Sequence, residues 1–330
     1  MTELFAMSQP IRWGMIGCGS VTEVKSAPAY QQTQGFELAM VMGRDSRNVR
    51  EYARRHGVAQ HVTDANVLIH DPRIDAVYIA TPPDSHRAYA LQVAAAGKPC
   101  CIEKPLAPRY ADSLAIVTAF QQADVPLFVS YYRRSLPRFN QIKQWLEAGK
   151  IGTVRHIHWA YTRTPSPLDK AGVYQWRTDA AIAPAGYFDD LASHGLDLFT
   201  YLLGNICNVN GISRNQQGLY SAQDAISACW LHNNGVTGTG SWHFGCHTRH
   251  DQVDIWGSHG HIQFAVFNDD NLQLDNADGK QCLFVENPVH IQRFHVENMR
   301  EHLQGKVIHP STGQTALHTS WIMEQILFSA

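Results

Sequence analysis

The chain has 330 residues, a length that suits two domains better than one compact core. Hydrophobic residues make up 44% and charged residues 17%, which is a globular composition and excludes a disordered or fibrous chain. The formal net charge of -2 leaves no basic excess, so it argues against nucleic acid or an anionic membrane as the partner.

The cysteines and the N-terminal residues indicate a reducing compartment. The 7 cysteines include no C-x-x-C pair, and we expect most of them to serve as small buried apolar side chains. Residues 1–10 lack the basic start and the apolar run of a signal peptide. Because no stretch approaches the roughly 20 apolar residues of a membrane span, we expect a cytoplasmic protein.

Segments typical of strands and of helices alternate over the first 130 residues. We expect strands at residues 11–16, 36–42, 76–80, 99–102 and 126–130, and helices at residues 21–32, 46–56, 85–96 and 109–122. Ser46 is the expected N-cap of the second helix, and Gly97 the expected stop of the third. Repeated β-α-β units predict an α/β fold with a doubly wound parallel sheet, which we assign to residues 1–130 as a Rossmann domain.

Longer strands predominate after residue 130. We expect helices at residues 137–149, 186–203, 289–304 and 313–328, and strands at residues 153–162, 225–231, 236–244, 252–256 and 261–267. Asn-Asn-Gly at residues 233–235 and Asp-Gly at residues 278–279 suit hairpin turns. We therefore assign residues 131–330 to a second, α+β domain with a mixed, mostly antiparallel sheet.

A glycine-rich turn follows the first expected strand and is the first sign of a nucleotide. We assign to a dinucleotide the turn residues Gly17, Cys18, Gly19, Ser20 and Val21. The first glycine permits a tight turn, and the second lets backbone N–H groups approach a pyrophosphate at the helix N-terminus. The third position of the fingerprint holds Thr22 instead of Gly or Ala, and such turns also occur without a ligand.

The end of the second strand bears on the choice between NAD and NADP. An NAD enzyme usually places an acidic residue there to bind the ribose hydroxyls. This chain has Gly43 at that position, followed by Arg44 and Asp45. Arg44 is either a partner for a 2′-phosphate or a solvated loop cation, and Asp45 can still serve the ribose. We lean towards NADP.

Two further motifs carry groups that can act on a proton or an oxygen. Lys104, in Glu-Lys-Pro, ends the expected fifth strand, where an ammonium can stabilise a developing alkoxide, and Pro105 can be cis. Asp190, His194 and Asp197 share one face of a later helix. A carboxylate four residues from an imidazole can orient it for proton exchange. The structural alternatives are a surface lysine and an ordinary exposed helix face.

Taken in order, the motifs resemble the glucose–fructose oxidoreductase and inositol dehydrogenase (Gfo/Idh/MocA) family over nearly the whole chain. The resemblance rests on residues 17–19, 80–86, 96–99, 103–105, 176–179, 186–197 and 310–313. It implies a Rossmann domain followed by a domain with an open-faced sheet, which often pairs the subunits of a homodimer or homotetramer. Two departures stand out, since Pro184-Ala185-Gly186 replaces three glycines and Tyr131-Tyr132-Arg133-Arg134 replaces a stretch that more often contains Asn.

The resemblance also assigns roles to residues. It makes Lys104, Asp190 and His194 catalytic, and it places on the cofactor side Thr81, Pro82, His86, Glu103 and also Lys104. Tyr131 and Arg177, together with Asp190 and His194, would lie close to the substrate.

We therefore expect an enzyme that transfers a hydride between NAD(P) and a secondary alcohol or ketone of a sugar, cyclitol or related polyol. His194 would act as base, Asp190 would orient it, and Lys104 would polarise the same oxygen. The alternatives are a dihydrodiol dehydrogenase and a non-catalytic dinucleotide-binding sensor. His243, Cys246, His247 and His250 could suggest zinc, but they lack a closed ligand pattern, so we expect no metal.

Overall fold

The computed structural model describes residues 9–328. The expectation that no signal peptide is present concerns mainly residues 1–8, which lie outside the described residues. The described chain forms two compact units, the first made of residues 9–135 and 288–317, and the second of residues 136–287 and 318–328. The sequence pattern gave no indication that residues 288–317 return to the first unit.

Within residues 9–135 and 288–317, six parallel strands form one sheet in the order β3-β2-β1-β4-β5-β6. The strands are β1 (Ile11–Ile16), β2 (Phe36–Met42), β3 (Gln60–Val62), β4 (Ala76–Ile79), β5 (Cys100–Ile102) and β6 (Leu127–Val129). The helices are α1 (Ser20–Val24), α2 (Ala27–Gln32), α3 (Ser46–His56), α4 (Ala65–His70), α5 (His86–Ala95), α6 (Tyr110–Ala123) and α10 (Arg293–Leu303). Two short 3-10 helices, η1 (Pro83–Ser85) and η2 (Tyr132–Ser135), complete the unit. The predicted doubly wound parallel sheet is confirmed.

Both faces of this sheet are buried, which explains why its strands are apolar throughout. On β4, Val77 belongs to one apolar cluster with residues of α4, α5 and α6, whereas Tyr78 belongs to another with residues of α2 and α3. Helix α10 adds Val296 and Met299 to this second cluster. The return segment therefore belongs to the first unit because its helix completes the cover of one sheet face.

The predicted continuous helix over residues 21–32 is wrong, because α1 and α2 are separate. Pro28 lies in the first turn of α2 and has no N–H to donate to the Val24 carbonyl, so the helix cannot continue through it. The ring of His290 is instead 2.8 Å from that carbonyl oxygen through Nδ1. The N-cap of α3 also differs from the prediction, since Asp45 rather than Ser46 accepts the hydrogen bond of the Asn48 N–H.

Within residues 136–287 and 318–328, eight strands form a sheet in the order β14-β13-β12-β11-β7-β10-β9-β8. The strands are β7 (Val154–Thr162), β8 (Ile206–Arg214), β9 (Ala225–His232), β10 (Thr237–His243), β11 (His250–Gly257), β12 (Gly260–Phe264), β13 (Leu272–Asn276) and β14 (Gly279–Leu283). β7 and β10 are parallel, and the other paired strands are antiparallel. The predicted mixed sheet and its two hairpins, between β9 and β10 and between β13 and β14, are confirmed.

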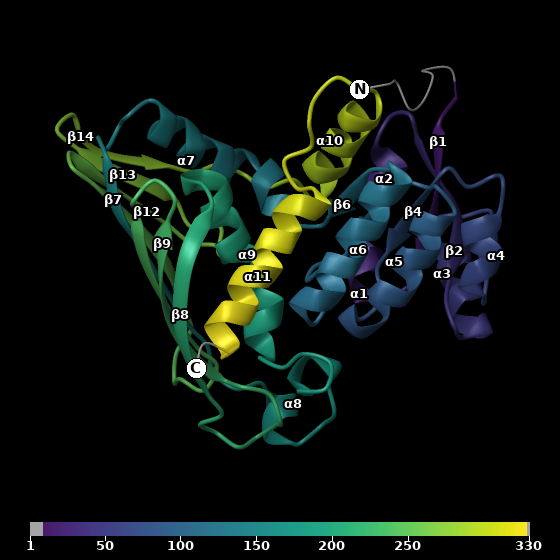
Figure 1. The fold of residues 1–330 in the computed structure, drawn as a ribbon, viewed down its shortest axis with the longest axis horizontal. Helices are drawn as coiled ribbons and strands as arrows, with labels where there is room; N and C mark the ends of the chain where they lie inside the picture. Colours follow the sequence, from purple (N-terminus) through teal and green to yellow (C-terminus); the bar gives the residue numbers. More distant parts are fainter. Residues whose placement is uncertain (1–8, 329–330) are drawn as a thin grey trace. The chain divides into compact units, whose positions relative to one another are not determined.

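Helices cover one face of this sheet (Figure 1). The helices are α7 (Pro137–Glu147), α8 (Pro167–Lys170), the 3-10 helix η3 (Trp176–Thr178), α9 (Tyr187–Leu203) and, from residue 318 on, α11 (Gly313–Phe328). Gly195 of α9 lies directly against the Trp159 ring of β7, because a Cβ at that glycine would be 2.3 Å from the ring. None of the helices formed by residues 9–328 combines the length and the apolar character that crossing a bilayer requires.

The opposite sheet face carries rings and polar groups that are only partly buried. Trp256 of β11 stacks between His156 and His261, with ring centroids 5.7 and 5.4 Å away. His156 lies 2.8 Å from the Thr237 hydroxyl through Nδ1, and His261 lies 2.8 Å from Asp254 Oδ1 through Nε2. Side chains of four neighbouring strands, β12, β11, β7 and β10, thus form an ordered polar surface rather than a bare apolar one.

Candidate active site

The carboxyl ends of the parallel strands carry the candidate residues of the first unit. In an open α/β sheet, ligands bind at this edge, where the strand order reverses. β1 lies between β2 and β4, so the turns that follow these three strands meet at that point. The turn after β5 is the next one along the same edge.

The glycine turn after β1 cannot hold larger residues at its first position. Gly17 has φ +107°, and a Cβ on it would lie 2.8 Å from the Ala80 carbonyl oxygen. Its N–H donates to the Met42 carbonyl at 2.9 Å, which ties the turn to the end of β2. Gly19 is the N-cap of α1, and the space around its missing Cβ is open for 4 Å. The turn thus offers uncovered backbone, as a pyrophosphate requires.

Thr22, the departure from the glycine fingerprint, has a structural use. Its hydroxyl donates to the Gly19 carbonyl at 2.8 Å, and its backbone N–H donates to the same oxygen at 3.0 Å. Tyr52 of α3 in turn donates to the Thr22 carbonyl at 3.0 Å. Thr22 is fully buried, so it closes the turn from inside, whereas Ser20 is exposed and Val21 packs partly buried against the apolar cluster.

The space at the end of β2 is so limited that it suits a residue without a side chain. A Cβ on Gly43 would lie 3.1 Å from Val49 Cβ and 3.9 Å from Cys18 Sγ, so the two predicted cofactor residues are neighbours. Cys18 Sγ lies 3.6 Å from the Met42 carbonyl oxygen, and burial raises the pKa of its thiol to about 12. Arg44 is exposed, whereas the Asp45 carboxylate caps α3. Arg44 therefore presents an exposed cation directly after Gly43 at this corner of the sheet edge.

The turn after β4 is braced by His86. Its ring is fully buried and lies 2.8 Å from the Thr81 carbonyl oxygen through Nε2 and 3.2 Å from the Pro105 carbonyl oxygen through Nδ1. Burial lowers the pKa of His86. The imidazole therefore links the turn of Thr81 and Pro82 to the Glu-Lys-Pro turn after β5.

The Glu-Lys-Pro turn follows β5 directly. The Lys104–Pro105 peptide bond is cis, as the sequence analysis allowed. Glu103 points into the protein, where its Oε1 accepts hydrogen bonds from Tyr78 at 2.6 Å and from Gln292 at 2.8 Å. Lys104 is partly exposed at the sheet edge. Sequence reasoning missed Tyr78 and Gln292, because no motif marks a buried tyrosine or a glutamine 189 residues further along the chain.

Tyr131, predicted to lie near the substrate, follows β6 and is almost fully buried. Its N–H donates to the Val129 carbonyl at 2.7 Å, so the chain turns sharply at the end of the strand. Tyr131 belongs to the apolar cluster of the first unit, on the side of α5 and α6.

In the second unit, α9 carries the predicted base, His194, and Asp190, which was predicted to orient it. Gly186 caps the helix with φ +58°, a conformation that suits glycine. The Asp190 carboxylate accepts a hydrogen bond from Arg177 Nε at 3.1 Å, and the Arg177 guanidinium lies 4.3 Å from the Trp176 ring centroid. The structure therefore brings together Asp190 and Arg177, two residues that the sequence placed separately at the substrate.

His194 lies one turn further along α9 and is 5% exposed. Its ring meets Phe267 edge-on at 6.0 Å. Asp197, on the same helical face, is fully buried and accepts a hydrogen bond from the Thr319 hydroxyl of α11 at 3.0 Å. Asp197 therefore fastens α9 to α11, whereas Asp190 and Arg177 are partly exposed.

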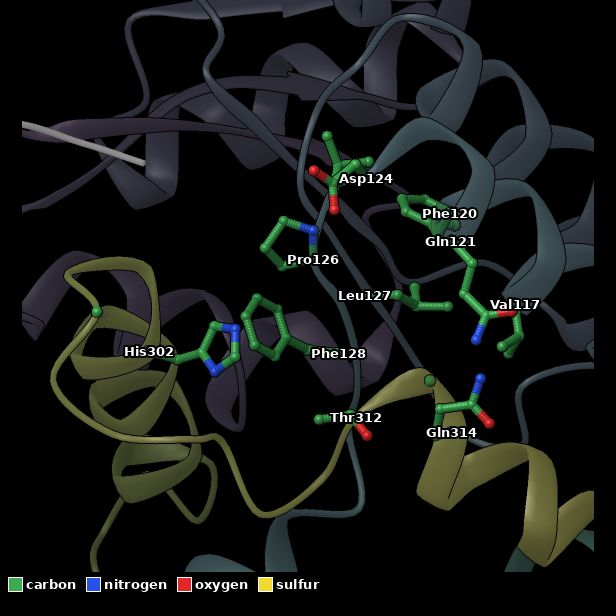
Figure 2. Close-up of a pocket in the computed structure, with 13 residues that line it drawn as sticks. Val117, Phe120, Gln121, Asp124, Pro126, Leu127, Phe128, His302, Thr312 and Gln314 are labelled. Atoms are coloured by element: carbon green, nitrogen blue, oxygen red, sulfur yellow. The ribbon is translucent and has the colours of Figure 1, made fainter. Parts of the chain in front are cut away.

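A pocket of about 560 Å³ lies elsewhere in the first unit (Figure 2). Figure 2 shows Leu127 and Phe128 between the end of α6, His302 of α10 and Gln314 at the start of α11. These residues surround the amino end of β6, so the pocket lies at the opposite sheet edge from the glycine turn. Among residues 9–328, no three His, Cys, Asp or Glu side chains are grouped as metal ligands.

Comparisons with known proteins agree with this architecture. A family model described as "Oxidoreductase family, NAD-binding Rossmann fold" matches residues 11–131, and the model of the GFO/IDH/MocA C-terminal domain matches residues 139–263. Oxidoreductase P35 of Formosa agariphila is 35% identical over 320 residues, which cover 96% of this chain and 98% of that protein. Levoglucosan dehydrogenase of Pseudarthrobacter phenanthrenivorans is 28% identical over 257 residues, or 69% of this chain and 66% of the relative.

A solved structure extends the likeness to the fold of the whole chain. Levoglucosan dehydrogenase in complex with NADH and levoglucosan superimposes with a TM-score of 0.84. It is 25% identical in sequence, and the match covers 96% of each chain.

Proposed function

Because this chain belongs to the Gfo/Idh/MocA oxidoreductase family, we propose that it is an NAD(P)-dependent dehydrogenase or reductase of a sugar, cyclitol or related polyol. One observation carries the proposal. The open glycine turn after β1 and the Glu-Lys-Pro turn after β5 lie at the same edge of the sheet. A relative named levoglucosan dehydrogenase, solved with NADH and levoglucosan, supports a polyol as the substrate.

The residues at the sheet edge fit a dinucleotide. Gly17 has no space for a side chain, and Gly19 leaves backbone uncovered where a pyrophosphate would bind. When bound, the nicotinamide supplies or accepts the hydride. Thr81 and Pro82, in the turn that His86 braces, would line the same edge.

We assign the proton chemistry to three side chains. His194 takes the proton of the substrate hydroxyl as its carbon loses a hydride, and returns it in the reverse direction. Lys104 polarises the oxygen, since an ammonium stabilises the developing alkoxide charge. Asp190 holds Arg177 by the 3.1 Å hydrogen bond and places a negative charge one turn before His194. Arg177 and Tyr131 would then orient the hydroxyl groups of the polyol.

We propose NADP as the preferred cofactor. Gly43 stands where a carboxylate would bind the ribose, and the Asp45 carboxylate is occupied as the cap of α3. The exposed guanidinium of Arg44 can bind a 2′-phosphate with two parallel hydrogen bonds.

We also propose a cytoplasmic homodimer or homotetramer, joined through the half-buried sheet face of the second unit. Ile212 and Leu231 are 68% and 38% exposed on neighbouring strands of that face, and Trp256 is 39% exposed in its histidine stack. Replacing Trp256 with Glu should convert the oligomer to monomers in light scattering, whereas a particle mass unchanged by the substitution would contradict this interface.

A cofactor screen tests the proposed activity. The purified protein should change the nicotinamide absorbance with a polyol or its ketone, and faster with NADP(H) than with NAD(H). The panel should hold sugars, cyclitols and anhydro sugars in both reaction directions. Coenzyme binding without turnover on any member would overturn the assignment as an enzyme of this substrate class.

A further inference from the structure

Three buried side chains meet beneath the Glu-Lys-Pro turn. The Tyr78 hydroxyl and the Gln292 amide both donate to Glu103 Oε1, at 2.6 and 2.8 Å. Oε2, the other carboxylate oxygen, lies 3.3 Å from the Lys104 backbone nitrogen, which donates to it. Tyr78, Gln292 and Glu103 are 0%, 1% and 7% exposed. The Glu103 carboxylate is therefore engaged inside the first unit on both of its oxygens.

Such a carboxylate is held firmly. Burial of a charged group is unfavourable unless its hydrogen bonds are satisfied, and bonds to an ionised acceptor are shorter and stronger than neutral ones. The backbone of Glu103 is fixed as well, since its N–H donates to the Ile79 carbonyl at 2.8 Å. Side chain and backbone together leave little freedom to the residue that precedes Lys104.

The two donors come from rigid parts of the first unit. Tyr78 lies on the central strand β4, where the Tyr30 ring stacks on it with centroids 5.0 Å apart. Gln292 is the N-cap residue of α10, the helix that Val296 and Met299 pack into the sheet. The position of the Glu-Lys-Pro turn thus depends on a segment that follows the second unit in the chain.

We infer that Tyr78 and Gln292 are positioning residues for Lys104, which act through Glu103 from the interior of the first unit. This inference rests on the proposed function for the role of Lys104. It assigns the Glu103 side chain to holding the turn, whereas the sequence analysis expected it on the cofactor side.

Single-atom and isosteric variants test the inference. Tyr78→Phe removes one hydroxyl, and Gln292→Met removes the amide while keeping the side-chain length. Each should lower kcat by roughly tenfold and shift its pH profile, with less than about a twofold change in the KM for coenzyme, since transition-state interactions are lost. Tyr30→Phe is the matched control, because it removes a neighbouring buried hydroxyl that does not bond to Glu103.

A double-mutant cycle tests the route through the carboxylate. In a Glu103→Met background, Tyr78→Phe should have no further effect on kcat, because the shared acceptor is already gone. Additive effects of the two substitutions would overturn the route through Glu103. Urea unfolding compares the free energies of unfolding of Tyr78→Phe and Tyr30→Phe. It shows whether a general loss of stability, equal in both variants, accounts for the change in kcat.

A probe that needs no substrate separates this inference from the proposed function. After reductive methylation with ¹³C-formaldehyde, the Lys104 resonance, assigned with Lys104→Arg, should shift in Tyr78→Phe and not in Tyr30→Phe. That shift supports the positioning role even if no polyol is oxidised, a result that would overturn the proposed function alone. An active enzyme whose kcat, pH profile and Lys104 resonance are all unchanged by Tyr78→Phe would overturn the inference.

Discussion

The turn of Lys104 and the helix of His194 are held by different forces. In the first unit, hydrogen bonds from Tyr78 and Gln292 fix the residue before Lys104. In the second unit, His194 sits on a helix of 17 residues whose neighbour Gly195 packs against Trp159. A group on a turn therefore depends on polar bonds with defined geometry, whereas a group on a buried helix depends on shape. We therefore expect different substitutions to disturb the Lys104 turn and the His194 helix.

The largest effect should come from the turn itself. Lys104→Ala removes the ammonium that we assign to the substrate oxygen, and kcat should fall by about 10²- to 10³-fold, as when an oxyanion donor is lost. Coenzyme affinity, measured by NADPH fluorescence, should stay within about twofold, since we assign binding of the dinucleotide to the glycine turn and to Arg44 rather than to Lys104.

Lys98 is the matched control for this substitution. It precedes β5 where Lys104 follows it, and its ammonium donates to the Asp71 carbonyl at 2.8 Å. Lys98→Ala should therefore leave kcat near the parent value. If Lys104→Ala turned over at the parent rate, Lys104 would have no role in the reaction. Proton transfer would then be assigned to α9 alone.

Acid should weaken the first unit before the second. Burial lowers the pKa of His309 to about 4, and that of His295 well below its ordinary value. Below pH 6.5 such a residue binds fewer protons when folded than when unfolded, so the free energy of unfolding falls as the pH drops. For His309 the loss amounts to about 3 kcal/mol between pH 6.5 and 4.

Urea unfolding at pH 6.5 and pH 4, with hydrogen exchange to locate the opening, measures this loss. His309→Gln should be less stable at pH 7 but should show a flatter pH dependence, because the titrating group is gone. A slope that persists unchanged in His309→Gln would assign the acid sensitivity to other groups, of which His232 in the second unit also has a pKa lowered by burial.

A substitution that adds volume to the packed face of α9 should disturb both the helix and its proposed base, His194. In Gly195→Ala the new Cβ would lie 2.3 Å from the Trp159 ring, so helix or ring must move. We expect the free energy of unfolding to fall by about 2 kcal/mol, as in other overpacked cores, and kcat to fall because His194 is the adjacent residue. Trp159→Phe removes the ring atoms that clash, so the double variant should be more stable than the sum of the two losses predicts.

The sequence predicted the fold well where one physical signal dominated. Strands buried on both faces and helices with clear stops, such as α5 before Gly97, were located within one or two residues. β3 and α4 were missed because each is short, and β3 is mostly exposed. The break between α1 and α2 follows from the missing N–H of Pro28, which is a local signal in the sequence.

The same distinction between local signals and long-range contacts applies to the candidate site. The glycine turn, the Glu-Lys-Pro turn and the helix of Asp190 and His194 are local motifs, so the sequence could single them out. The bond between Asp190 and Arg177 and the bonds of Glu103 join residues from separate elements. Register and packing decide those contacts, and a single sequence does not display them.

The smallest effect we expect concerns the 2′-phosphate end of the cofactor. There we assign binding to the exposed charge of Arg44, without a network of buried hydrogen bonds. Arg44→Ser should lower kcat/KM for NADPH by about tenfold, the worth of one charge-assisted contact at the surface, and leave kcat/KM for NADH nearly unchanged. Arg54→Ser, another exposed arginine at the far end of α3, is the control. Equal losses with both coenzymes would show that Arg44 binds a part they share, and the missing carboxylate at Gly43 would then be compatible with NAD. A loss confined to NADPH would instead show that a turn residue with no side-chain support can set specificity, even though the turn of Lys104 needs such support for turnover.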